Sequence, residues 1–166
     1  MATKTQRLWR HLFTDRADVN RAFPPAELQR VEAAVAASER RHGGQVCVVI
    51  EAALPLMRVW QGVTPRERAL EVFGLLRVWD TERNDGVLVY LLLADKDVEI
   101  VADRGINAKV GAAAWETICR GMEAAFREGR HTEGVEAGVA AIADLLVVHA
   151  PGTRGGNELS DRPIIL

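Results

Sequence analysis

Two aspartates are the residues of this sequence best placed for chemistry. Asp85 directly precedes an apolar run that is typical of a strand, and Asp103 directly follows the next such run. The polar residues 94–97 between the two runs have the length of a hairpin loop. In an antiparallel hairpin both aspartates therefore lie at the same end of the sheet. Two carboxylates that meet there can hold a hard cation or share a proton.

Neighbouring side chains extend this candidate site. Asp80 and Asn84 lie in the loop before the first strand of the hairpin and can add oxygen ligands for Ca²⁺ or Mg²⁺. Arg104 follows the second strand, and its planar guanidinium group suits a phosphate. A structural interpretation stays open, in which Asp85 caps a turn and Asp103 pairs with Arg104 as a solvated charge.

A second acidic pair, Asp95 and Asp97, resembles the D-x-D motif of aspartyl-phosphate phosphatases. That chemistry needs a nucleophile at the end of a strand that leads into a loop, whereas here the chain runs directly into another strand. An EF-hand loop that starts at Asp95 fails as well, because Ile100 stands where glycine is needed and Ile106 where glutamate is needed. We therefore predict a solvated hairpin tip.

Serine, cysteine and histidine chemistry finds little support. Ser38 lies in a helical pattern and Ser160 in the last stretch of the chain, and neither sits in a strained elbow. Cys47 and Cys119 lie in apolar patterns without a neighbouring histidine, so we predict two small buried hydrophobic residues. The four histidines show no zinc-ligand spacing and are predicted at the surface or at helix ends. No glycine-rich phosphate loop is present in the sequence.

The composition is that of an ordinary globular domain. The chain has 166 residues, of which 48% are hydrophobic and 27% charged. Its formal net charge of −2 argues against a nucleic-acid partner, which would require a basic surplus. No stretch reaches the roughly 18 apolar residues of a membrane span, and the first residues lack the apolar core of a signal peptide. We therefore expect a cytoplasmic protein.

The elements that must position the aspartates alternate between helices and strands. Helices are predicted after Pro24-Pro25, after the Thr64 capping box, at residues 107–127 with a possible break at Gly111, and from Thr132 onward. Strands are predicted at residues 46–50, 87–93 and 98–102. Apolar strands of this kind are covered on both faces. We therefore predict the α/β class: a three-layer α/β/α sandwich, with a mixed sheet of about four strands and helices on both faces.

The chain divides into three parts. Residues 1–21 form an N-terminal segment that we expect to pack on the domain, and residues 22–150 form the α/β domain itself. Residues 151–166 have the composition of a loop and are predicted to be a flexible C-terminal tail.

Four tryptophans bear on possible partners. Trp79 and Trp115 lie near helical stripes and are predicted in the core. Trp9 and Trp60 lie in less regular stretches, and Trp9 stands in an apolar cluster near the N-terminus. This cluster can form an amphipathic contact for a partner or for a membrane surface. Packing of the cluster on the domain is the favoured alternative.

The order of the elements and several short motifs resemble the TPM domain family. Residues 41–49 match its glycine turn into an apolar strand, and residues 84–88 match its N-D-G turn into the next strand. Residues 98–106 match the strand that ends in a glycine, and residues 126–130 match the link into the last helix. The resemblance covers roughly residues 22–150. The details look most like a bacterial subgroup encoded beside LemA-like membrane proteins and secreted TPM proteins.

The resemblance implies two functions, since some TPM proteins are acid phosphatases and some bind divalent cations in an acidic cleft. The phosphatase function implies Asp85, Asp103 and Arg104 as catalytic residues. Cation binding implies Asp85, Asp103, Asp80 and Asn84 as ligands of Ca²⁺ or Mg²⁺. The favoured prediction is a non-catalytic interaction or accessory domain with a protein partner, which can be membrane-associated. The alternative is a weak, cation-assisted acid phosphatase that hydrolyses phosphomonoesters.

Overall fold

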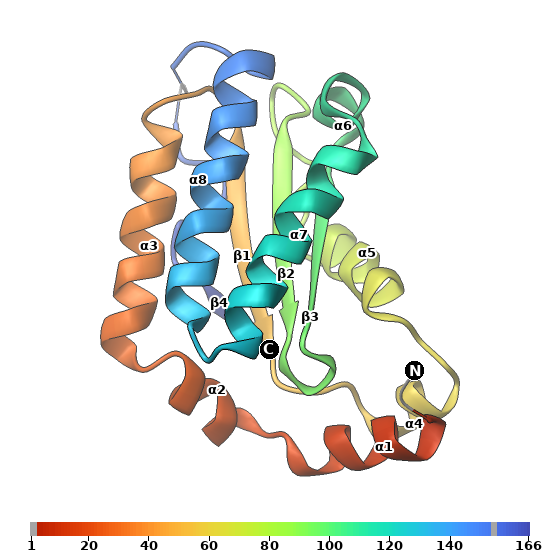
Figure 1. Ribbon diagram of the computed structural model, residues 1–166. Coiled ribbons are helices and arrows are strands. Elements are labelled where there is room, and N and C mark those ends of the chain that lie inside the picture. The colour runs from red at the N-terminus through yellow and green to blue at the C-terminus, as the bar shows by residue number, and fades with distance from the viewer. Residues whose placement is uncertain (1–2, 154–155) are drawn as a thin grey trace.

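The computed structural model describes residues 3–153 and 156–166 (Figure 1). Residues 1–2 of the predicted N-terminal segment and residues 154–155 of the predicted tail lie outside the described residues. The elements follow one another as α1 (Lys4–Phe13), α2 (Arg16–Ala22), α3 (Pro25–Glu39), β1 (Gln45–Glu51), α4 (Leu56–Trp60), α5 (Pro65–Leu75), β2 (Gly86–Leu92), η1 (Leu93–Asp95), β3 (Asp97–Ala102), α6 (Arg104–Val110), α7 (Ala112–Arg127), α8 (His131–His149) and β4 (Ile164–Ile165).

The four strands form one mixed sheet in the order β3-β2-β1-β4. Strand β1 runs parallel to β2 and to β4, whereas β2 and β3 form the predicted antiparallel hairpin. Every residue of β1 and β2 is buried, as expected for strands covered on both faces.

Helices cover both faces of this sheet, which confirms the predicted α/β/α sandwich. Helices α3, α7 and α8 lie together over one face, and α5 lies on the other side (Figure 1). The side chains of β1 alternate between the two cores: Val46, Val48 and Ile50 point to the α3–α8 side, and Cys47 and Val49 point to the α5 side.

The end of the chain completes the sheet. In place of the flexible tail predicted for residues 151–166, Ile164 and Ile165 pair with β1, and the amide of Leu166 donates a hydrogen bond of 3.0 Å to the carbonyl of Ile50. The side-chain oxygen of Gln45 accepts hydrogen bonds from the amides of residues 158 and 159. These contacts hold the last residues of the chain against β1.

Local signals placed several boundaries correctly. Thr64 and Glu67 form the predicted capping box at the start of α5. Gly111, with φ of 85°, separates α6 from α7, as its position within the predicted helix suggested. Trp115 is buried as predicted, but Trp79 is 48% exposed, so its predicted place in the core is wrong. Trp79 follows the end of α5, where the guanidinium of Arg77 lies over its ring.

None of the helices in the described parts of the chain is both long enough and apolar enough to cross a membrane.

Candidate functional site

The sheet register places Asp85 and Asp103 at the same end of the β2–β3 hairpin. Val87 lies opposite Ala102, and the amide of Asp103 donates a hydrogen bond of 2.9 Å to the carbonyl of Gly86. Both aspartates are buried. Hairpin topology therefore places the two aspartates of the candidate site at the same end of the sheet.

Each of these carboxylates also has a structural role. Asp103 is the N-cap of α6, and its Oδ1 accepts a hydrogen bond of 2.6 Å from the amide of Arg104. Asp85 anchors the preceding turn, because its amide donates to the hydroxyl of Thr81, and its Oδ2 lies 3.6 Å from Nε of Arg83. Burial raises the pKa of Asp85, although the charge of Arg83 opposes this shift.

The remaining residues of the predicted site do not converge on the two aspartates. Asp80 is exposed and pairs with Arg77, and the Arg104 side chain is exposed. Asn84 lines a small cleft of about 90 Å³ together with Asp85, but this cleft is also lined by Lys109. Across residues 3–153 and 156–166, no group of three or more histidine, cysteine, aspartate or glutamate side chains is arranged to hold a metal ion.

The cleft at this end of the sheet is therefore small, and both acidic and basic side chains line it. Ligand sites for small organic molecules usually enclose about 300–1,000 Å³, and the cleft beside Asp85 is well below that range. Oδ2 of Asp85 and Oδ2 of Asp103 are buried and accept no hydrogen bond in the described structure. The cleft is lined by Asn84 and Asp85, but neither Asp103 nor Arg104 lines it.

The opposite end of the hairpin differs from the prediction of a solvated tip. The Asp95 side chain is 8% exposed and accepts hydrogen bonds from Arg7 at 2.7 and 2.9 Å. Arg10 lies at 3.4 Å, and Nε2 of His11 lies at 3.2 Å. Burial alone raises the pKa of Asp95, but hydrogen bonds from His11 and Arg7 outweigh it and bring the pKa to about 2. The cations come from α1, which lies against the hairpin loop.

His11 fixes the geometry of this anchor. It is buried in α1, and its Nδ1 accepts a hydrogen bond of 2.9 Å from the amide of Leu54. An imidazole nitrogen that accepts a hydrogen bond carries no proton, so the ring proton is on Nε2 and faces Asp95. His11 lies in the last turn of α1, as the prediction of surface or helix-end histidines allows, although it is buried. His42 lies two residues beyond the C-cap of α3 and is fully buried, so the prediction is wrong for it. Burial lowers the pKa of His42 to about 4.

The two cysteines offer no reactive thiol. Cys47 is buried in β1 as predicted, whereas Cys119 in α7 is only partly buried. Burial raises the pKa of Cys47 to about 11 and that of Cys119 to about 12, so both stay protonated near neutral pH.

Asp97 is the most perturbed carboxyl group at this end of the molecule. Burial raises its pKa to about 7, and the charges of Glu99, Glu123 and Asp95 add to the shift. Its side chain borders two clefts, one of about 580 Å³ beside α2 and one of about 490 Å³ between β3 and α7. Both clefts have the size of ligand sites, unlike the cleft at Asp85.

The raised pKa of Asp97 predicts a pH-dependent change in stability. Because the folded-state pKa is above the unfolded value of 3.8, Asp97 favours the folded state less as the pH rises from about 4 to about 7. We expect Asp97→Asn to be more stable than the parent chain by about 1–3 kcal/mol above pH 7, with the difference vanishing below about pH 4. Urea denaturation across this pH range measures it. Asp144→Asn, at an exposed ion pair, is the control, and a gain for Asp97→Asn that did not depend on pH would contradict the assignment.

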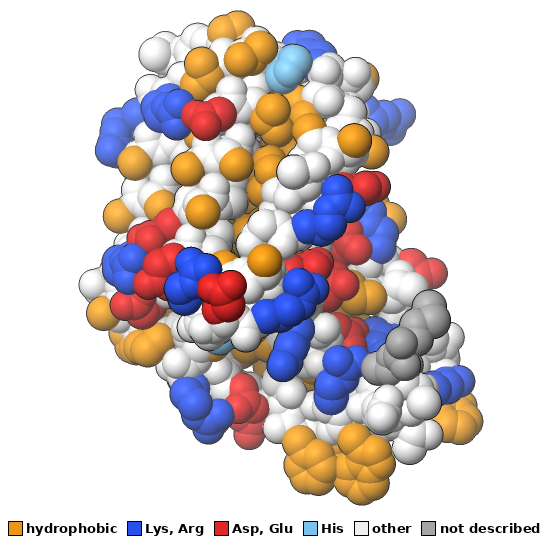
Figure 2. Space-filling view, viewed as in Figure 1, with side chains coloured by type: hydrophobic (Ala, Val, Ile, Leu, Met, Phe, Trp, Pro, Cys, Tyr) orange, Lys and Arg blue, Asp and Glu red, His pale blue; other side chains and the backbone are white. Residues whose placement is uncertain are grey.

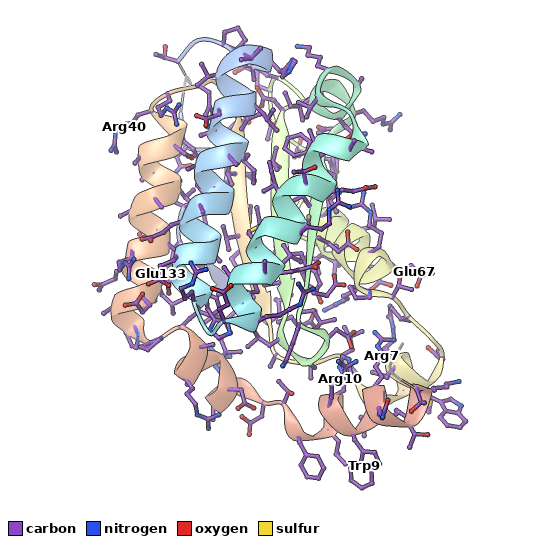
Figure 3. All side chains as sticks on the ribbon, viewed as in Figure 1. Arg7, Trp9, Arg10, Arg40, Glu67 and Glu133 are labelled. Carbon is purple, nitrogen blue, oxygen red and sulfur yellow. The ribbon has the colours of Figure 1, made fainter. Side chains whose placement is uncertain are left out.

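Apolar side chains gather outside α1 and α4. Trp9 is 55% exposed and Phe13 is 72% exposed, and their rings stack with centroids 5.5 Å apart. Figure 3 shows Trp9 directed away from the domain, and Figure 2 shows large hydrophobic side chains protruding at the lower edge of the molecule. We call the exposed apolar side chains of these two helices the aromatic surface: Trp9, Leu12, Phe13, Leu56, Met57 and Trp60.

The favoured prediction that the Trp9 cluster packs on the domain is wrong for Trp9, because its side chain is exposed. Helix α1 is two-sided: Arg7 and His11, four residues apart, point to Asp95, whereas Trp9 and Phe13 point to solvent. The ammonium group of Lys4 lies 4.5 Å from the centre of the Trp60 ring and so links α1 to α4. The polar face of α1 thus docks while its apolar face remains exposed.

The family model of the TPM domain matches residues 16–145. This chain belongs to the TPM domain family. The match confirms the resemblance inferred from the N-D-G turn and the neighbouring motifs. Helix α1 and strand β4 lie outside the matched residues of this TPM domain protein.

Solved structures show the same fold. The solution structure of protein BA42 from the psychrophilic bacterium Bizionia argentinensis is similar, with a TM-score of 0.74 and 24% sequence identity over 85% of this chain and 93% of that protein. The N-terminal domain of a protein from P. gingivalis is similar with a TM-score of 0.61 and 18% identity, over 80% of this chain and 82% of that domain. No curated protein sequence matches this chain significantly.

Sequence reasoning missed the anchor that holds α1. Asp95 and Arg7 are 88 positions apart, so no local pattern connects them. One signal was present: Arg7 and His11 recur at helical spacing, with Trp9 and Phe13 on the remaining face. A helix with one polar face and one aromatic face predicts two different contacts, one with the domain and one with a partner.

Proposed function

We propose that this TPM domain protein is a non-catalytic, cytoplasmic interaction domain that contacts a membrane-associated partner through its aromatic surface. The observation that carries the proposal is the exposure of Trp9, Phe13 and Trp60 on helices that the rest of the domain holds in place. Monomeric proteins rarely leave clustered aromatic side chains in water unless these form a contact site. Buried Asp95 fixes α1, so the surface is presented in a defined orientation.

The end of the sheet that carries Asp85 and Asp103 supports a structural role better than catalysis. One carboxylate oxygen of Asp103 accepts the hydrogen bond that caps α6. The cleft beside Asp85 is too small for a phosphomonoester, and neither Asp103 nor Arg104 lines it. The three residues of the predicted phosphatase site are therefore near one another in the fold without forming one cavity.

A divalent cation at this end fits the residues in part. Ca²⁺ and Mg²⁺ prefer oxygen ligands. Oδ2 of Asp103 and Oδ2 of Asp85 accept no hydrogen bond and can supply two of them, although Oδ2 of Asp85 also lies 3.6 Å from Nε of Arg83. Asn84 can add an amide oxygen from the same cleft, whereas Asp80 pairs with Arg77 instead. We propose a weak site of two carboxylates in which Ca²⁺ or Mg²⁺ neutralises buried charge and steadies the loop before β2.

The alternative function is a cation-assisted acid phosphatase, and one observation favours it. The pKa of Asp85 is raised by burial, and a carboxyl group with a raised pKa can act as a general acid. In this alternative Asp103 would help to hold the cation, and Arg104 would contact the phosphate.

Hydrolysis of p-nitrophenyl phosphate separates the two functions. The assay compares the parent chain with Asp85→Asn, Asp103→Asn, from about pH 5 to about pH 8, with Ca²⁺, Mg²⁺ or EDTA. Asparagine is a good N-cap, so the double variant keeps the cap of α6. We expect no turnover that depends on the two aspartates. The exposed Arg104→Ala variant tests the site without a risk to folding, and turnover that is lost in both folded variants would overturn the proposed function.

A further inference from the structure

A basic cleft opens beside the aromatic surface. It encloses about 580 Å³ and lies between α2, the β2–β3 hairpin and the ends of α7 and α8. Cationic side chains reach it from three of these elements, namely Arg21, Lys96 and Arg127, and the His131 imidazole lines it as well. Phe13 lines the cleft and also belongs to the aromatic surface, so the two features are continuous.

The charges in the cleft leave a cationic surplus. Arg21, Lys96 and Arg127 line it together with the carboxyl groups of Asp18 and Asp97, which leaves a formal surplus of one positive charge. Arg21 pairs with Asp18, and Arg127 pairs with Glu123. Lys96, at the tip of the hairpin, takes part in no ion pair among the described residues. Its backbone is left-handed, with φ of 54°, because it ends the turn of η1 at the tip of the hairpin. The hairpin thus presents the Lys96 ammonium group to a cleft that the carboxyl group of Asp97 also lines.

The N-terminal segment, which carries Trp9 and Phe13, is rich in basic residues. The first 22 residues contain five lysines and arginines and two aspartates, a formal charge of +3. The whole chain carries −2, so the remaining residues carry −5. Arg7 and Arg10 pair with Asp95 and Arg21 pairs with Asp18, so Lys4 and Arg16 are the cations of this segment that take part in no ion pair among the described residues.

The exposed aromatic side chains of α1 suit a lipid bilayer as the partner. Trp9 stands out from the molecule beneath α1 (Figure 3), at the lower edge where large hydrophobic side chains protrude (Figure 2). The ring of Phe13 stacks on that of Trp9. Tryptophan at a membrane interface places its ring at the level of the headgroups, and nearby lysine and arginine add attraction to anionic lipids. The Trp9–Phe13 pair can contact the apolar part of a lipid, and the neighbouring cleft can bind its anionic headgroup.

We propose that the aromatic surface and the basic cleft together dock this domain on an anionic phospholipid bilayer. Trp9, Phe13 and Trp60 enter the interface, and Lys96 and Arg127 contact a lipid phosphate in the cleft. The inference rests on the proposed function and names the chemistry of its partner.

Co-sedimentation with vesicles tests the inference on the full chain. The two vesicle types contain phosphatidylcholine alone, or phosphatidylcholine with phosphatidylglycerol. We expect binding to the anionic vesicles to be stronger by about tenfold or more, since each basic residue at the surface contributes a severalfold gain. Quenching of tryptophan emission by brominated lipid is expected in the parent chain, reduced in Trp9→Phe and lost in Trp9→Phe, Trp60→Phe.

Matched variants separate the aromatic and basic contributions. Trp9→Ala, Phe13→Ala should lower binding to anionic vesicles by about tenfold or more, whereas Trp79→Ala, an exposed tryptophan elsewhere, should leave it unchanged. Lys96→Glu, Arg127→Glu should remove the preference for phosphatidylglycerol, and Arg120→Glu, an exposed arginine outside the cleft, should retain it.

The inference is overturned if the parent chain does not bind anionic vesicles, or if Trp9→Ala, Phe13→Ala binds them as well as the parent chain does. A preference for phosphatidylglycerol that remains in Lys96→Glu, Arg127→Glu also overturns it. These failures leave the proposed function standing. Aspartate-dependent hydrolysis of p-nitrophenyl phosphate, by contrast, overturns the proposed function whatever the vesicles show.

Discussion

Replacing Asp95 with alanine is expected to detach α1 from the domain and to lower the free energy of unfolding by about 2–4 kcal/mol. The substitution leaves the Arg7 guanidinium and the Nε2–H of buried His11 without their acceptor. Urea denaturation measures the loss of stability, and hydrogen exchange of α1 shows whether the helix is released. Asp144→Ala, which removes an exposed ion pair with Arg41, should cost less than about 1 kcal/mol.

The effect of Asp95→Ala should depend on pH in a defined direction. The folded-state pKa of about 2 lies below the unfolded value of 3.8, so the stabilisation by Asp95 is complete above about pH 4 and is lost as the pH falls towards 2. The difference between the parent chain and the variant should shrink over that interval. A cost no larger than that of Asp144→Ala near neutral pH would show that Asp95 does not anchor α1.

Gly86→Ala is expected to destabilise the fold by about 2–4 kcal/mol. A Cβ atom at Gly86 would lie 2.1 Å from the carbonyl oxygen of Val78, which is main chain and cannot rotate away. This contact gives a physical reason for the glycine in the N-D-G turn that begins β2. Thermal and urea unfolding measure the loss, and backbone displacement at the start of β2 should accompany it.

Gly121→Ala provides the matched control for that substitution. Gly121 lies in α7 with open space around the position of its missing Cβ. Alanine is favoured over glycine inside a helix by about 0.5–1 kcal/mol, so this variant should be slightly more stable than the parent chain. Equal behaviour of Gly86→Ala and Gly121→Ala would contradict the close approach of Val78 to β2.

The parts of the fold that local chemistry determines could be predicted from the sequence. A continuous β-branched run marked β1 and a continuous apolar run marked β2. The polar residues 94–97 marked the hairpin, and Gly111 marked the break between α6 and α7. Strand β4 escaped prediction because it has only two residues and follows a stretch rich in glycine and polar residues. Its place in the sheet depends on pairing with β1, which no local pattern reveals.

The candidate site was predictable only as far as the topology of the hairpin reaches. That topology puts Asp85 and Asp103 at one end of the sheet, and the register bears this out. The directions of the Asp80 and Arg104 side chains depend on local ion pairs and exposure instead, so their predicted convergence with the aspartates does not appear.

Whether the apolar face of α1 packs on the domain or is exposed could not be predicted from the sequence, for a different reason. An apolar face on a short helix looks the same whether it packs on its own domain or binds a partner. Only the docking of Arg7 and His11 on Asp95 decides which face of α1 points inward. The sequence predicts a solvated hairpin tip at Asp95, and this prediction gives no partner for its carboxylate.

Site-specific photo-crosslinking in the native cells tests the central claim most directly. A benzophenone amino acid replaces Trp9 in the aromatic surface, or the similarly exposed Trp79 elsewhere, and adducts are identified by mass spectrometry. The account predicts light-dependent adducts with membrane lipid or a membrane-associated protein from position 9 and none from position 79. Equal adducts from both positions, or none from position 9, would contradict an interaction domain that works through α1 and α4.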